Sequence, residues 1–215
     1  MKQRIKIGLT GPSSTGKSTL ARDFALNTGI PFKSVQTADV LQECGYASHA
    51  DLVKAGLEAN LKFQKKLVEA RLNLLHSDSD FITDRTPLDS LVYYNMSAMH
   101  DPEALDPAWE SQVIRSLAGY TLVQFLPFGS IPMEQAERRI NSSLYHAMTS
   151  AMFKLYIQHM SSTFLGISGL SVIESVSSDR VSRVLDVIAD TDSNLLQTTG
   201  IGHSVALKYD TIRLS

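Results

Sequence analysis

Short stretches of alternating or continuous apolar residues are spaced along the chain, and each of them predicts a β-strand. In the first stretch, Ile5, Ile7 and Leu9 alternate with other residues directly before a glycine-rich segment. The later stretches are bounded by glycine, proline or acidic residues. The strands predicted on this basis are 5–10, 32–36, 80–84, 121–126 and 170–174.

The segments between these strands favour helices. The clearest is a long helix from about Asp51 to His76. Its apolar residues at helical spacing are Leu57, Leu61, Val68, Leu72 and Leu75. Further helices are predicted at 19–26, from residue 87, at 107–119, from 133 to about 164 and at 179–189. This alternation indicates an α/β fold with a five-stranded parallel sheet and helices on both faces.

A glycine-rich loop joins the first strand to the first helix. It reads Gly11-Pro12-Ser13-Ser14-Thr15-Gly16-Lys17-Ser18 and matches the phosphate-binding pattern G-x-x-x-x-G-K-[ST]. Strand, glycine loop and helix follow one another in the order that this pattern requires, which predicts a P-loop NTPase fold. The expected nucleotide-binding residues are Gly11, Pro12, Ser13, Ser14, Thr15, Gly16, Lys17, Ser18 and Thr19.

The chemistry of this loop predicts that it binds ATP together with Mg²⁺. Glycine allows backbone angles closed to other residues, so consecutive N–H groups can turn toward an anion. The helix that follows adds unpaired N–H groups and the positive end of its dipole. We expect Lys17 to reach the β- and γ-phosphates and the Ser18 hydroxyl to ligate Mg²⁺.

Composition narrows the class of protein. The chain has 215 residues, 43% of them apolar and 20% charged, with a net charge of −2. This balance argues against broad electrostatic binding to nucleic acid and leaves a local basic channel open. The single cysteine, Cys44, suits a reducing compartment. No apolar run reaches the length of a membrane span, so we expect a cytoplasmic protein, in the host cytoplasm if the source is viral.

Acidic residues follow two of the predicted strands, at the sheet edge where α/β folds bind ligands. Asp84 ends the third strand and is followed by Arg85. Asp39 follows the second strand, and it either contacts an acceptor substrate or caps the next helix. The long helix carries Lys62, Lys65, Lys66 and Arg71. These residues favour a solvated helix face, with a basic rim beside an acceptor cleft as the alternative.

Residues 81–85, with Ser90 and Tyr93, resemble the Asp-Arg segment of thymidylate kinases. Together with the phosphate loop and an arginine-bearing segment after the fourth strand, most of residues 1–190 resembles the thymidylate and nucleoside kinase group. The resemblance implies a kinase domain over 1–190, with a helical lid at about 127–140. Residues 191–215 are then a C-terminal extension.

The resemblance also implies catalytic roles. The catalytic residues would be Lys17, Asp84, Arg85, Arg138 and Arg139. Asp84 acts near Mg²⁺, as a metal or metal-water ligand or as the base, and Arg85 clamps the acceptor. Arg138 and Arg139 belong to the lid and approach the transferring phosphate. Arginine suits these roles because its planar fork binds two oxygens.

The sequence departs from thymidylate kinases on the acceptor side. It has Ser13 and Ser14 where that family has an acidic residue, and 36–39 reads Gln-Thr-Ala-Asp in place of Arg-Glu-Pro. A changed acceptor is therefore expected. One candidate is 5-hydroxymethyluracil in phage DNA, phosphorylated by a branch of the same family. The other is a free nucleoside or nucleotide, as in the nicotinamide-riboside kinase group.

Other functional classes fit the loop less well. P-loop ATPases that act as motors or switches usually end the metal-binding strand in Asp-Glu, whereas Asp84 is followed by Arg85 here. This difference favours phosphoryl transfer over hydrolysis. A nucleotide-binding regulator without catalysis is the third class, and the intact pair of Lys17 and Ser18 argues mildly against it. The expected partner is a nucleoside- or nucleotide-type acceptor, and a homodimer is left open.

Overall fold

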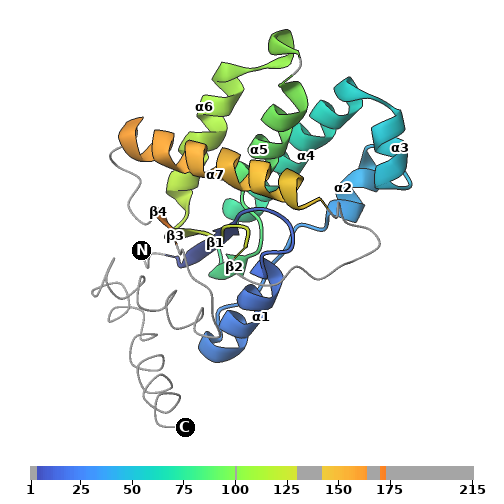
Figure 1. Ribbon diagram of the computed structural model, residues 1–215. Coiled ribbons are helices and arrows are strands. Elements are labelled where there is room, and N and C mark those ends of the chain that lie inside the picture. Colours follow the sequence, from blue (N-terminus) through green and yellow to red (C-terminus); the bar gives the residue numbers. More distant parts are fainter. Residues whose placement is uncertain (1–3, 100, 130–141, 164–169, 173–215) are drawn as a thin grey trace.

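A parallel β-sheet forms the centre of the protein (Figure 1). The structure is a computed structural model that describes residues 4–99, 101–129, 142–163 and 170–172. Within these residues the sheet has four strands in the order β2-β1-β3-β4. The strands are β1 (Lys6–Thr10), β2 (Phe81–Thr83), β3 (Leu122–Phe125) and β4 (Leu170–Val172). The predicted α/β fold with a parallel sheet is confirmed.

The predicted strand at 32–36 is reduced to a single bridge. Phe32 pairs in parallel with Ile82, beside β2. The Ile82 N–H donates to Pro31 O, and the Lys33 N–H donates to Ile82 O, both at 2.9 Å. The chain then leaves the sheet, because Ser34 bonds to a side chain beyond the end of β2 and a helix begins at Thr37. The prediction of a full strand at 32–36 was wrong, although the segment lies at the sheet edge.

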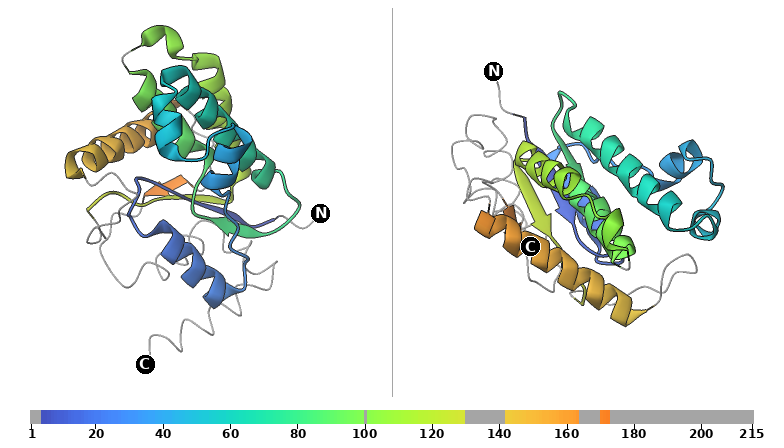
Figure 2. Two further views of the ribbon diagram at one scale, coloured as in Figure 1. Left: turned by 90° about the vertical axis from the view of Figure 1, so that its right-hand side faces the viewer. Right: turned by 90° about the horizontal axis from the view of Figure 1, so that it is seen from above.

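Helices cover both faces of the sheet (Figure 2). α1 (Lys17–Thr28) lies on one face, and α4 (Leu57–Leu75), α5 (Pro87–Ala98), α6 (Pro107–Ser116) and α7 (Ser143–Thr163) lie on the other. The shorter elements are α2 (Thr37–Glu43), α3 (His49–Lys54), η1 (Pro102–Ala104) and η2 (Leu117–Gly119).

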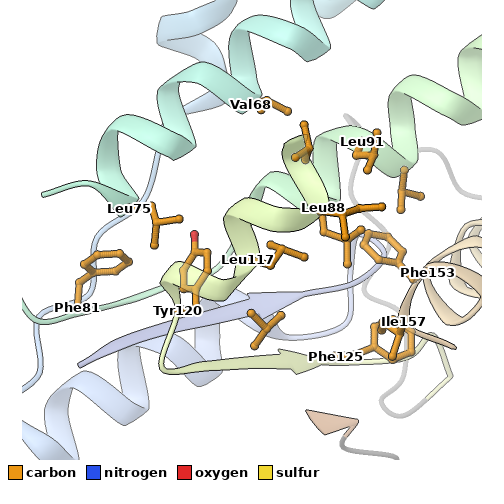
Figure 3. Close-up of a cluster of buried hydrophobic side chains, with 14 residues drawn as sticks. Val68, Leu75, Phe81, Leu88, Leu91, Leu117, Tyr120, Phe125, Phe153 and Ile157 are labelled. Carbon is orange, nitrogen blue, oxygen red and sulfur yellow. The ribbon is translucent and has the colours of Figure 1, made fainter. Parts of the chain in front are cut away.

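Buried apolar side chains lie on both faces of the sheet, as expected of a parallel sheet between helices. Under α1, the buried cluster includes the three alternating β1 residues Ile5, Ile7 and Leu9. On the other face, Phe81 of β2 and Phe125 of β3 pack with residues of α4 to α7 (Figure 3). The alternation read from the sequence thus sets which side chains reach each helical layer.

The long helix predicted from about Asp51 to His76 is two helices. α3 ends at Lys54 and α4 begins at Leu57, with Gly56 between them at φ 92°. Non-glycine residues rarely adopt this angle, so Gly56 ends the continuous helical path. Ser48 caps α3 by accepting from the Asp51 N–H at 3.2 Å, as serine commonly does at a helix N-terminus.

Some expectations lie outside the described residues. They include most of the proposed lid, with Arg138 and Arg139, the helix at 179–189 and the extension at 191–215. The boundary between kinase domain and extension stays a prediction for the same reason. Among the described helices, none combines the length and apolar character needed to cross a membrane.

Candidate functional site

The phosphate loop connects the end of β1 to the start of α1 in a tight turn. Gly11 has φ 138° and Gly16 has φ 77°, both angles that favour glycine, and Ser14 has φ 63°. A Cβ on Gly11 would lie 2.4 Å from Leu126 O, so this position also needs glycine for space. The backbone therefore explains both glycines of the sequence pattern.

The Lys17 ammonium lies within the turn of this loop. Its Nζ donates to Gly11 O at 2.8 Å, to Thr15 Oγ1 at 3.0 Å and to Pro12 O. The residue is only 5% exposed. The cation that the motif assigns to phosphate binding is therefore held in the loop itself.

Asp84 lies between the loop helix and the edge of the sheet. The Ser18 hydroxyl donates to its Oδ2 at 2.5 Å, and the Ser34 hydroxyl donates to its Oδ1 at 2.7 Å. Hydroxyl and carboxylate oxygens are ligands that Mg²⁺ accepts. The two residues predicted as metal ligands, Ser18 and Asp84, are thus in direct contact, and their chemistry fits the ion.

Arg85 contacts the phosphate loop. Its Nη1 donates to Gly11 O at 2.9 Å and to Asp89 Oδ1 at 2.8 Å, and its Nη2 donates to Ser13 Oγ at 3.3 Å. Ser13 also lies 3.4 Å from the Tyr93 hydroxyl. The guanidinium therefore lies on the nucleotide side of the site, and its role as an acceptor clamp stays a prediction.

A fully buried carboxylate, Asp89, joins the loop to the start of α5. Its Oδ2 accepts from the Thr10 hydroxyl at 2.8 Å and from the Thr86 N–H at 2.8 Å. Its Oδ1 accepts from the Gly11 N–H at 3.3 Å and from Arg85. One side chain of α5 therefore fixes the end of β1, the first loop glycine and Arg85 relative to one another.

Charges around Asp89 offset the cost of burying it. Burial acts to raise its pKa, but the cations Arg85, Lys17 and Arg71 outweigh this effect, and the pKa lies below its usual range. Burial lowers the pKa of Arg71 to about 10. Arg71 Nη1 donates to Thr86 O at 3.4 Å and to the Ser90 hydroxyl. Two arginines, the buried Arg71 and the partly exposed Arg85, thus surround one buried carboxylate, Asp89.

The basic residues of α4 do not form one solvated face. Arg71 is buried, which corrects the favoured interpretation for this residue. Lys65 bonds to Asp106 at 2.9 Å and lies over the Trp109 ring, and Lys66 bonds to Glu69 at 2.6 Å. Lys62 is exposed. Arg71 lies on the same face of α4 as the buried apolar residues, so the packing of that face buries Arg71 as well.

Asp39 lies in the first turn of α2 and is exposed. The helix N-cap is Gln36, so Asp39 is not itself the cap. Its negative charge suits the positive end of the helix dipole. The structure leaves its contact with an acceptor as a prediction.

Sequence reasoning missed several residues that the structure brings to this region. The spacing of Thr86 and Asp89, with Pro87 between them, has the form of a helix start and was the available signal for Asp89. Ser34 carried no such signal. Gln64 is buried on α4, and its Oε1 has no hydrogen-bond partner among the residues that the structure describes. An unpaired buried amide oxygen is costly and therefore unusual in a folded protein.

Comparisons with known proteins agree with this architecture. A family model described as an AAA domain matches residues 6–161. No curated protein sequence matches the chain. Among solved structures, a deoxyadenosine kinase from M. mycoides has a TM-score of 0.59 at 15% identity, over 87% of this chain and 100% of that chain.

Two further structures share the fold. The NadR protein in complex with NAD and AMP-PNP has a TM-score of 0.57 at 15% identity, covering 88% of this chain and 49% of its own. A thymidylate kinase from Candida albicans has a TM-score of 0.52 at 15% identity, covering 90% and 94%. Such likeness shows a P-loop kinase fold. The family match runs from β1 through the loop and Asp84 into α7, so the chain belongs to the AAA domain family.

Proposed function

We propose that this protein is an ATP-dependent kinase that transfers a γ-phosphoryl group to a nucleoside- or nucleotide-type acceptor. The observation that carries the proposal is the contact between Ser18 and Asp84 beside the phosphate loop, with Arg85 as the next residue. A hydrolase needs a base that activates water. Here the residue after the metal-site aspartate is a cation whose contacts go to Gly11, Ser13 and Asp89.

Each residue has a distinct task in this proposal. The loop amides and Lys17 bind the phosphates of ATP, and Arg85 adds positive charge at Gly11, close to the same phosphates. Ser18 and Asp84 hold Mg²⁺, which neutralises charge on the phosphates when bound. Asp89 holds Arg85 and the loop at fixed positions relative to one another through its hydrogen bonds to both. Catalysis of this kind depends on positioning and charge, which preformed contacts supply.

The acceptor is proposed to lie on the other side of Asp84, toward α2 and α4. On α4, Gln64 Oε1 lacks a hydrogen-bond partner within the described part of the chain, and an N–H donor such as the edge of a base would supply one. The structural neighbours include a deoxyadenosine kinase and a thymidylate kinase, which supports a nucleoside- or nucleotide-type acceptor. The NadR protein was solved in complex with NAD, which supports a pyridine nucleoside as a further candidate acceptor.

Binding to DNA is the weaker alternative. Of the basic residues on α4, Arg71 is buried, and Lys65 and Lys66 already pair with acidic side chains. Few positive charges remain on this helix for contacts to phosphates, on which DNA binding depends. We therefore place a free nucleoside-type acceptor ahead of 5-hydroxymethyluracil in DNA.

A transfer screen tests the proposal. The protein is incubated with γ-labelled ATP, Mg²⁺ and a panel of nucleosides, nucleoside monophosphates, nicotinamide riboside and 5-hydroxymethyluracil DNA, with Lys17→Ala as the inactive control. Labelled acceptor is expected with the native protein alone. Release of labelled phosphate without any labelled acceptor would instead support an ATPase.

Gln64→Leu tests acceptor recognition separately. It removes a buried amide oxygen that has no partner among the described residues, together with a long 3.4 Å hydrogen bond from Nε2 to Asn60 Oδ1, so stability is expected to change little. The acceptor KM should increase about tenfold or more, because a hydrogen bond to the substrate is lost. An unchanged acceptor KM in the folded variant would remove Gln64 from the acceptor site.

A further inference from the structure

The helix α7 is apolar on the side that faces away from the sheet. Its inner side carries the buried Phe153 and Ile157, which pack with Phe125 of β3 (Figure 3). The opposite side carries exposed residues at intervals of four, three and four positions, which helical periodicity places in one line. We call them the α7 stripe: Leu144, Met148, Ala151 and Leu155. Leu144 is 69% exposed and Leu155 is 59% exposed.

The composition of α7 differs from that of an ordinary surface helix. Within Ser143–Thr163, Lys154 is the only Asp, Glu, Lys or Arg residue in the sequence. A surface helix usually carries charged residues on its outer face, whereas a helix that is apolar all round is normally covered. Figure 2 shows α7 at one end of the row of helices on its face of the sheet, where α5 packs beside it. Exposed apolar residues gathered in one line there indicate an interaction surface.

The single charge of α7 also limits the kind of partner that fits. Helices that bind lipid surfaces carry several Lys and Arg residues beside their apolar face. A charged protein partner would need opposite charges around the contact. The α7 stripe instead suits a partner helix that is itself apolar and nearly uncharged, and α7 of a second copy of this chain has this character.

The α7 stripe is complementary to itself when two copies run antiparallel. The spacing of four, three and four positions reads the same in both directions, so a two-fold axis can pass through its middle. Leu144 then lies opposite Leu155 of the second copy. Met148 lies opposite Ala151 of the second copy, so a long side chain faces a short one. Long and short residues in alternation let two helices pack closely.

The one charged side chain of α7 does not oppose this pairing. In the antiparallel arrangement, Lys154 of one copy and Lys154 of the other are about nine residues, or about 14 Å, apart along the helices. That separation exceeds the Debye length of about 8 Å at physiological salt. Repulsion between the two lysines is therefore largely screened.

We propose that the α7 stripe is the contact surface of a homodimer, in which two α7 helices pack antiparallel about a two-fold axis. This inference does not depend on the proposed kinase function. A standard interface buries about 800 Å² on each partner, whereas four side chains of this size expose roughly a few hundred Å². The dimer is therefore weak, with a Kd of about 10–100 μM.

Sedimentation equilibrium of the full chain measures the association. Between about 5 and 500 μM, the native protein should change from mostly monomer to mostly dimer. Leu155→Glu places a carboxylate against Leu144 of the second copy and should weaken the dimer at least about tenfold. Leu26→Glu is the matched control, because Leu26 is 80% exposed on α1, on the other face of the sheet. It should leave the association unchanged.

A mixing experiment tests the antiparallel arrangement. Leu144→Lys and Leu155→Glu should each weaken self-association. Mixed in equal amounts, the two variants should pair with each other, because the introduced lysine of one lies opposite the introduced glutamate of the other. Both positions are exposed, so both variants should fold, and urea unfolding at low concentration checks this.

Three outcomes would overturn the proposal. A native protein that stays monomeric at about 500 μM would assign the α7 stripe to another segment of the chain or to a different partner. A dimer that Leu155→Glu leaves intact would place the interface on another surface. A mixture of the two variants that stays monomeric would exclude the antiparallel pairing.

Discussion

Asp89→Asn should be among the most destabilising single substitutions in the described part of the chain. The carboxylate is fully buried and accepts from Thr10, Gly11, Arg85 and Thr86. Asparagine has nearly the same shape, so it creates no cavity. It removes the negative charge and turns one acceptor oxygen into a donor that faces other donors.

The size of the effect follows from the charges left behind. Removing one partner of a buried ion pair typically costs about 3–5 kcal/mol, because the other charge stays buried and uncompensated. Here Arg85 loses its salt bridge, and the nearby Arg71 loses a compensating charge. For a domain of this size, this loss corresponds to a fall in Tm of about 10 °C.

Urea unfolding at several pH values measures the loss and checks its cause. The pKa of Asp89 is lowered in the folded protein. Its contribution to stability is therefore full above the ordinary pKa of about 4 and is lost as pH falls through the lower folded value. The difference between native protein and variant should stay constant from pH 7 to pH 5 and shrink below about pH 4.

Asp106→Asn provides the control. Asp106 caps α6 and pairs with Lys65 at a partly exposed site. Asparagine caps helices well, and partly exposed ion pairs contribute little, so the expected loss is below about 1 kcal/mol. A similar small loss for Asp89→Asn, or a difference that does not depend on pH, would refute the charge argument.

Three other predictions concern the loop and its surroundings. Lys17→Ala should lower phosphoryl transfer at least about a hundredfold in a folded protein, measured by labelled-ATP transfer. Asp84→Asn should reduce kcat more than it reduces ATP affinity, whereas Arg85→Lys should raise the acceptor KM. Steady-state kinetics and calorimetric titration with ATP measure these effects. Wild-type values in both variants would leave Asp84 and Arg85 with structural roles alone. Gly8→Ala should cost about 1–3 kcal/mol in urea unfolding, because its Cβ would lie 2.5 Å from Thr86 Cγ2. Adding Thr86→Ser should recover part of that loss.

The sequence predicted the parts of the fold that depend on local pattern. The alternation of Ile5, Ile7 and Leu9 placed β1, and the motif from Gly11 to Ser18 placed the loop and the start of α1. These elements follow from side-chain period and from backbone angles, both of which can be read locally. Ser18 and Asp84 were both expected to act near one Mg²⁺ ion, and the structure brings the two side chains into contact.

The remaining errors have physical causes that act at longer range. The segment at 32–36 has strand composition, yet the bond from Ser34 to Asp84 and the start of α2 draw it away from the sheet. Arg71 has the composition of a surface residue, but it is buried among polar groups of α5. Both outcomes depend on partners distant in sequence, which a local pattern does not contain.

The position of β1 at the middle of the sheet has a consequence for synthesis on the ribosome. The Lys6 N–H bonds to the side chain of Thr121, which is 115 residues later. At about 5–20 residues per second, that stretch takes roughly 6–23 s to translate. Until β3 emerges, one edge of β1 has no partner and Gly11 lacks its contact with Leu126. The phosphate loop therefore reaches its final surroundings late in translation, and the open edge of β1 needs protection from pairing with another chain during that interval.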